Sequence, residues 1–217
     1  WYDSMVAKLI AHAPTREQCI DQLAAAVDRT VLLGLQSNRA FLGRLLRHEN
    51  FRVGLDVSTA FIEKQFGAAE TRQPQPDAKL WALAAWISVA GAPEVECTPS
   101  AWRNWSTSRP LPQPWRLRWH APAALAGATT EMRGRLYLTP CSAQVEHPAG
   151  QVQLQAVPVT TGVQAKADID GEHVDYRYAW SGATLWLHTL QGDYAFDCRR
   201  REAARSSETD GAAAMEV

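Results

Sequence analysis

Several features that define common protein classes are scarce in this sequence of 217 residues. It has only four cysteines and no CxxC pair, which argues against a zinc ribbon or a disulfide scaffold and favours a reduced, cytosolic protein. No apolar run approaches the roughly 18–20 residues that span a bilayer. The formal net charge is −1, so global charge does not favour binding to nucleic acid or to an anionic membrane.

Motifs of common catalytic and metal sites are missing as well. The six histidines show no metal-ligand spacing and no HExxH motif, so no metal site is expected in the chain. No serine lies in a Gly-x-Ser-x-Gly elbow, so nothing supports a serine hydrolase. What remains is an ordinary globular composition, 46% hydrophobic and 21% charged, with an unusual nine tryptophans.

The first part of the chain shows mainly helical patterns. Residues 5–11 form a short apolar run that predicts a buried strand. Thr15 and Gln18 form a capping box, and the apolar spacing that follows predicts a helix over residues 15–29. Further elements are expected as a strand at 31–34, a helix around 41–46 and a short helix over 61–66.

The middle of the chain contains a linker and an enclosed helix. Residues 68–77 hold two prolines and no large apolar side chain, which is typical of a domain boundary. Residues 78–90 are apolar on nearly every side, and a helix of that kind is usually surrounded by other elements. Gly91 and Pro93 are expected to end this helix.

From residue 115 the hydrophobic period changes to two. Turn signals such as Asp170-Gly171 and Ser181-Gly182 separate the alternating segments, which predicts antiparallel hairpins. The expected strands are 115–119, 133–138, 152–156, 173–178 and 184–188. The simplest architecture is an α+β protein whose antiparallel β-barrel, or strongly curved sheet, closes around helix 78–90.

Several blocks in residues 1–67 resemble the C-terminal part of biotin carboxylase, an ATP-grasp-type domain. They agree with the family in order and spacing, and they are Tyr2-Asp3-Ser4-Met5, Ala7-Lys8-Leu9-Ile10, Thr15-Arg16, Gly34-Leu35-Gln36-Ser37-Asn38, the stretch from His48 to Gly54, and Thr59-Ala60-Phe61-Ile62-Glu63.

Residues 78–200 resemble, more loosely, the mediating (BT) domain of biotin-bearing acyl-CoA carboxylase subunits. The likeness rests on the helix after a linker, the aromatic turn at 102–108 and the alternating Trp115-Arg116-Leu117. It implies a small antiparallel barrel around a central helix that docks the carboxyltransferase subunit. The likeness is greatest to methylcrotonyl-CoA and geranyl-CoA carboxylases and smaller to propionyl-CoA carboxylase. The expected divisions are 1–67, linker 68–77, barrel 78–200 and a tail at 201–217.

The resemblance also implies a function. Subunits of this family use ATP and Mg²⁺ to carboxylate biotin, and a carboxyltransferase (beta) subunit then transfers CO₂ to the acyl-CoA that it binds. A hetero-oligomer in the bacterial cytoplasm is therefore expected. We expect this chain to be a segment of a longer polypeptide, with the ATP and Mg²⁺ sites mostly before it and biotin attached outside it, so that the segment alone is inactive.

The resemblance assigns roles to two residues of the first part. Asp3 lies in the turn that the family places near the biotin and bicarbonate pocket, where it would orient a catalytic base or arginine, or would merely fix the turn. Thr59 aligns with a position that lines the adenine site, where it would be at most a packing contact.

Trp102, Arg103 and Trp105 are the candidate partner-binding residues. Loops rich in Trp and Arg are typical of protein–protein hot spots, although both indoles could instead plug the barrel mouth. Base stacking on these rings is a formal alternative that the neutral charge disfavours. The alternative function is a free-standing, small ligand-binding β-barrel. A helix that fills the barrel would leave little room for a ligand, which argues against this alternative.

Overall fold

A computed structural model describes residues 5–68, 70–90, 110–122, 130–139, 142–156 and 162–198. The chain divides into two compact units. The first comprises residues 1–74 together with 190–193, and the second comprises residues 75–189 together with 194–217. Among the helices of these described ranges, none has the length and hydropathy that a membrane crossing requires.

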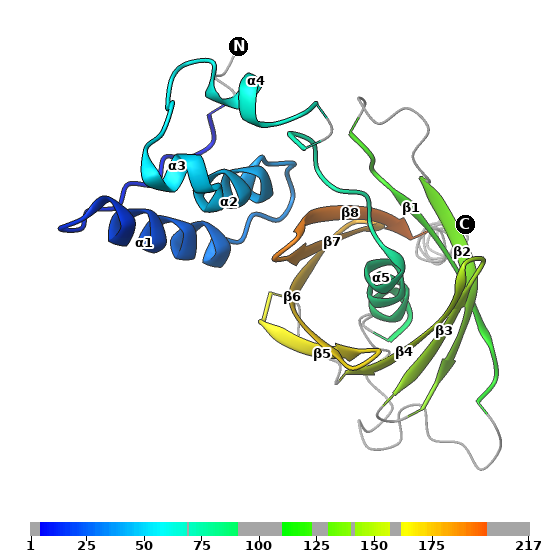
Figure 1. The fold of residues 1–217 in the computed structure, drawn as a ribbon. Helices are drawn as coiled ribbons and strands as arrows, with labels where there is room; N and C mark the ends of the chain where they lie inside the picture. Colours follow the sequence, from blue (N-terminus) through cyan, green and yellow to red (C-terminus); the bar gives the residue numbers. More distant parts are fainter. Residues whose placement is uncertain are drawn as a thin grey trace, which may run out of the picture. The chain divides into compact units, whose positions relative to one another are not determined.

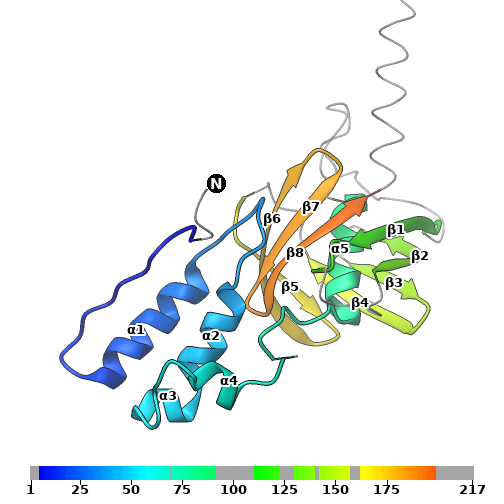
Figure 2. The ribbon, with the colours of Figure 1, turned by 90° about the horizontal axis from the view of Figure 1, so that it is seen from above.

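The first unit is built from four helices. They are α1 (Arg16–Arg29), α2 (Arg39–Arg47), α3 (Glu49–Val53) and α4 (Phe61–Gln65). The predicted cap of α1 is confirmed, because the Thr15 side chain accepts a hydrogen bond from the Gln18 amide. Helices α1 and α2 lie side by side (Figure 2), and their buried side chains Ile20, Ala24, Val27 and Leu46 form a small core.

Two strands predicted in this unit are wrong. Residues 5–11 and 31–34 form no strand. The apolar side chains of the first run, including Met5 and Ile10, are exposed, and Ile10 is 82% accessible. An apolar run becomes a buried strand only where a neighbouring strand completes its backbone hydrogen bonds. No strand in the described ranges pairs with either segment.

Helix α3 was not predicted. It has five residues and ends where Gly54 adopts a left-handed conformation with φ of 79°. The hydrophobic periodicity of so short a helix covers little more than one turn. The short helix expected over 61–66 is present as α4.

The second unit contains the long apolar helix α5 (Ala78–Ala90), as predicted, and most of a β-barrel. The eight strands follow one another around a closed antiparallel barrel, and β1 pairs with β8 to complete it. They are β1 (Gln113–Trp119), β2 (Glu131–Leu138), β3 (Ala143–His147), β4 (Gly150–Ala156), β5 (Ala165–Ile169), β6 (Glu172–Ser181), β7 (Thr184–Thr189) and β8 (Gly192–Cys198).

The closed antiparallel barrel agrees with the sequence pattern, although the expected strands do not include β3, β5 or β8. Strands β3 and β5 are short, with five residues each. Their inward positions are partly alanine: Ala143 in β3, and Ala165 and Ala167 in β5. Alanine contributes little to an alternating hydrophobic signal and is depleted in strands.

Helix α5 and the inward side chains of the strands form one hydrophobic core. Figure 1 looks along the barrel and shows α5 within the ring of strands. All eight residues from Leu80 to Ile87 are buried. Trp81 packs edge-on against Phe196 of β8, with 5.0 Å between the ring centroids. The interior is therefore filled by side chains of the helix and the strands together.

Candidate functional site

Most of the site residues expected from the sequence lie outside the described residues. Asp3, Trp102, Arg103 and Trp105 are all in this group, so their roles stay predictions. Thr59 is described, and it is exposed in the turn that precedes α4. Nothing in its surroundings tests a contact with adenine.

The residues that follow Thr59 belong to an aromatic cluster. Phe61 is buried, and its ring meets His48 at 5.6 Å, Phe51 at 5.8 Å and Phe66 at 6.4 Å between centroids. These edge-on contacts hold α3 and α4 together. Across the described ranges there is no group of three or more His, Cys, Asp or Glu side chains that could bind a metal ion.

The first unit also contains a buried ion pair. Arg39 at the start of α2 donates through Nε and Nη2 to the two carboxylate oxygens of Asp193, at 3.0 Å and 3.2 Å. The side chains are 4% and 3% exposed. Ser37 donates a further hydrogen bond to the same carboxylate. The bidentate geometry and added donor compensate part of the cost of burying both charges, which indicates a structural role.

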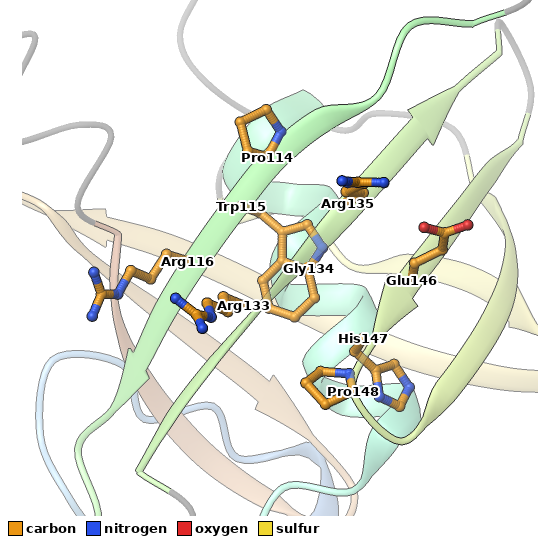
Figure 3. Close-up of a pocket in the computed structure, with 9 residues that line it drawn as sticks. All are labelled: Pro114, Trp115, Arg116, Arg133, Gly134, Arg135, Glu146, His147 and Pro148. Carbon is orange, nitrogen blue, oxygen red and sulfur yellow. The ribbon is translucent and has the colours of Figure 1, made fainter.

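A concave surface with charged walls lies on the outer side of strands β1, β2 and β3 (Figure 3). It is an open groove of about 830 Å³. The groove is lined by Pro114, Trp115, Arg116, Arg133, Gly134, Arg135, Glu146, His147 and Pro148. Three arginines and a single glutamate thus carry the formal charges of its lining.

The strand register explains why the arginines gather there. Arg116 and Arg118 alternate with inward residues on β1, and Arg133 and Arg135 do so on β2. Arg116 lies directly opposite Arg133, so two like charges face each other across the hairpin. Like charges in this position destabilise a strand pair.

The groove contains few neutralising partners. Arg116 forms an ion pair with Glu131. Glu146 lies opposite Arg135 but accepts hydrogen bonds from Tyr137 and Gln151. Arg133 and Arg135 are exposed, and neither forms an ion pair with another side chain in the described ranges. Positive charge therefore dominates this face.

Gly134 lines the groove at a point where strands β2 and β3 approach closely. A Cβ atom at this position would lie 1.8 Å from the carbonyl oxygen of Glu146 and 2.9 Å from the ring of Trp115. Trp115 is buried, and its indole Nε1 has no hydrogen-bond partner in the described part of the chain. Glycine is required here by a close approach of the backbone.

Sequence reasoning missed this groove. The arginines were visible as the polar positions of alternating strands, but a polar position in a strand normally indicates only a solvent-facing side chain. Their functional interest depends on the register that sets Arg116 against Arg133, and on the third strand β3, which was not predicted.

The comparison with known proteins concerns mainly the first unit. Residues 1–64 match the family described as Biotin carboxylase C-terminal domain. The chain is 41% identical over 63 residues to Biotin carboxylase 1, chloroplastic, of Populus trichocarpa, which covers 29% of this chain and 12% of that protein.

Two carboxylase subunits show similar likeness. Over 87 residues, the chain is 36% identical to the Propionyl-CoA carboxylase alpha chain of Ruegeria pomeroyi, which covers 39% of this chain and 13% of the relative. It is 40% identical over 62 residues to the mitochondrial Methylcrotonoyl-CoA carboxylase subunit alpha of Dictyostelium discoideum, covering 29% and 9%. The chain thus spans about an eighth of the length of the first two relatives.

Residues 1–64 therefore carry a biotin carboxylase C-terminal domain. Relatives of this part include biotin carboxylases and the alpha subunits of acyl-CoA carboxylases. The family match ends before α5 and the barrel, so it assigns nothing to the second unit.

Proposed function

We propose that this chain is a segment of the biotin-bearing alpha subunit of an acyl-CoA carboxylase. The observation that carries the proposal is the order of parts in one chain. A biotin carboxylase C-terminal domain is followed by a closed eight-stranded antiparallel barrel with an apolar helix in its core. The alignment with a propionyl-CoA carboxylase alpha chain supports this assignment, because it includes more residues than the family match.

In this proposal the barrel is the mediating (BT) domain. Its task is to bind the carboxyltransferase subunit and to tether the biotin carrier between two active sites. Tethering raises the effective concentration of the carried group at each site, which accelerates transfer without any chemical step in the barrel. Trp102, Arg103 and Trp105 are the proposed contacts with the partner.

The chemistry belongs to other parts of the proposed enzyme. ATP and Mg²⁺ would drive the carboxylation of biotin, and the carboxyltransferase subunit would pass CO₂ to its acyl-CoA. We place the ATP site mostly outside this segment and the biotin attachment entirely outside it. Asp3 and Thr59 are its proposed contributions near the biotin and adenine pockets, and the segment alone is expected to be inactive.

A free-standing ligand-binding barrel is less well supported. A barrel of eight strands is just wide enough to be filled by side chains or to hold one small ligand. Here the core is occupied by α5, whose residues Ala82 to Ala85 are completely buried. A ligand would have to displace the helix.

The proposal is tested on the native polypeptide. An antibody raised against the barrel locates the protein in a cell extract, and streptavidin reports biotin on the same band. The proposal expects a biotinylated band well above 24.0 kDa that co-purifies with a carboxyltransferase subunit. An unbiotinylated band near 24.0 kDa would refute it and favour the free-standing barrel.

A further inference from the structure

The outer face of strands β1 to β3 carries an excess of positive charge that the residues described in the structure do not balance. Residues 113–147 contain four arginines and only two acidic residues, Glu131 and Glu146. The sequence between β1 and β2, and between β2 and β3, contains no aspartate or glutamate. The neighbouring strand β4 presents glutamines at its exposed positions 151, 153 and 155.

The arrangement of these charges has a cost for the fold. Arg116 and Arg133 are directly opposite in the register, where Cβ atoms lie about 4.5–5.5 Å apart. Glu131 pairs with Arg116 but not with Arg133 in the described structure. A surface selected only for stability would place a neutral or acidic residue opposite Arg116. The retained repulsion suggests that Arg133 interacts with something outside the chain.

The groove beside these arginines indicates the kind of molecule. Pro114 and Pro148 add apolar surface to the lining of the groove, which also contains Arg116, Arg133 and Arg135. Arginine binds carboxylates through a planar fork and is enriched at protein interfaces. A phosphate-rich polymer fits less well, because the carboxylate of Glu146 also lines the groove and the chain has no net positive charge.

We infer that this outer face is a docking surface for an acidic segment of a protein, with Arg133 and Arg135 as its charge contacts. The segment carries aspartate or glutamate side chains toward the arginines and an apolar residue toward the exposed Pro114 and Pro148. The inference rests on the proposed function in one respect, which is that the docking protein is the carboxyltransferase subunit.

The test measures binding of the full-length polypeptide to the purified carboxyltransferase subunit at several salt concentrations. The double variant R133E/R135E is expected to weaken binding at least tenfold, mainly through a slower association rate, and to flatten the salt dependence. The matched control is K166E/R177E, which makes the same change in charge on the outer faces of β5 and β6. This control is expected to bind as the wild type does.

Loss of folding is separated from loss of contact by a stability measurement. The single variant Arg133→Glu removes the repulsion with Arg116, so its melting temperature should equal or exceed that of the wild type while its binding weakens. The neutral variant R133Q/R135Q should show an intermediate loss of affinity. Unchanged affinity and unchanged salt dependence in R133E/R135E would overturn the inference.

Two probes separate this inference from the proposed function. A fluorescein-labelled peptide rich in Glu and Leu should bind the wild type more tightly than R133E/R135E. If it does so while the carboxyltransferase subunit fails to bind at all, the docking surface stands and the proposed function falls. Tighter binding to heparin or to phosphatidylglycerol vesicles than to the peptide would overturn the assignment of a protein partner.

Discussion

Arg39 and Asp193 show how a single buried pair can be essential without being strongly stabilising. Their bidentate hydrogen bonds offset much of the cost of removing two charges from water. Removing one partner leaves the other charge buried and uncompensated. Arg47 and Asp28 make a chemically similar pair, but the Arg47 side chain is 51% exposed. In that pair water screens the charges and can replace either partner.

The variant Arg39→Ala is therefore expected to lower the free energy of unfolding by about 3 kcal/mol. Arg47→Ala, the exposed control, should cost less than about 1 kcal/mol. Urea denaturation of both variants checks the difference. Equal losses for the two would contradict the buried character of the Arg39 pair.

Tyr176 is a second residue whose burial has a measurable consequence. It is 1% exposed, and its hydroxyl has no hydrogen-bond partner in the described part of the chain. Burial in the core, with a smaller contribution from Tyr178, raises the pKa of Tyr176 above its ordinary value. The folded protein thus keeps this phenol neutral at a pH where the unfolded chain ionises it.

Because the pKa is higher in the folded state, the stability associated with Tyr176 is complete below its unfolded pKa of about 10 and decreases as the pH rises above that value. Tyr176→Phe should be neutral or slightly stabilising at pH 8, since it removes an unpaired buried hydroxyl. It should also lose less stability than the wild type between pH 8 and 10.5. Denaturant unfolding at these two pH values is the measurement, and parallel losses would contradict it.

At the scale of elements, the barrel shows which parts a sequence pattern can reveal. Helix α5 and the strands β1, β2, β4, β6 and β7 were predictable because long apolar runs or large alternating side chains mark them. Strands β3 and β5 place alanines inward, and their signal is correspondingly weak. The apolar run at 5–11 was misleading because periodicity cannot show whether a partner strand is available.

The hairpin β2–β3 depends on a residue whose role sequence alone could not show. Gly134 is the only small residue at an inward position between Met132 and Leu138. The alternation of side chains around it is that of a regular strand, so the sequence does not mark Gly134 as special. Only the structure reveals that the Glu146 carbonyl occupies the place of a side chain. Gly134 also lines the groove on the outer face.

Gly134→Ala is expected to destabilise the protein by about 3 kcal/mol, because the new methyl group meets backbone rather than a movable side chain. Gly150→Ala is a useful comparison at a hairpin, since it has open space but an unfavourable φ of 145°. Thermal melting should distinguish the effect of steric overlap from that of backbone strain. We expect Gly134→Ala to lower the melting temperature more than Gly150→Ala does. A wild-type melting temperature for Gly134→Ala would show that β3 can move away.

At the scale of the whole molecule, the proposed role is to connect an enzyme domain to a partner protein. The biotin carboxylase C-terminal domain was predictable because its motifs are ordered and closely spaced over residues 1–64. The candidate partner loop was predicted from its Trp and Arg content and from the resemblance to the mediating domain, and Trp102 and Trp105 lie outside the described residues. Composition can indicate a surface suited to binding, but it does not identify the surface that binds.

The variant Trp105→Ala is expected to weaken assembly with the carboxyltransferase subunit by about tenfold or more, in the range of an interface hot spot. The isolated polypeptide should keep its melting temperature. Size-exclusion co-elution with the partner, followed by a titration, measures the effect. Unchanged co-elution at all concentrations would remove Trp105 from the interface.

The strand order of the barrel has a consequence for how the chain acquires its fold. Every strand pairs with its neighbour in sequence except at the closing contact, where Leu117 of β1 meets Cys198 of β8. The connections between successive strands have eleven residues or fewer, so each of these pairings closes a small loop at a low cost in chain entropy. Joining β1 to β8 closes a loop that spans nearly the whole barrel and carries a larger cost. We therefore expect the sealing of the sheet around α5 to be a late step of folding.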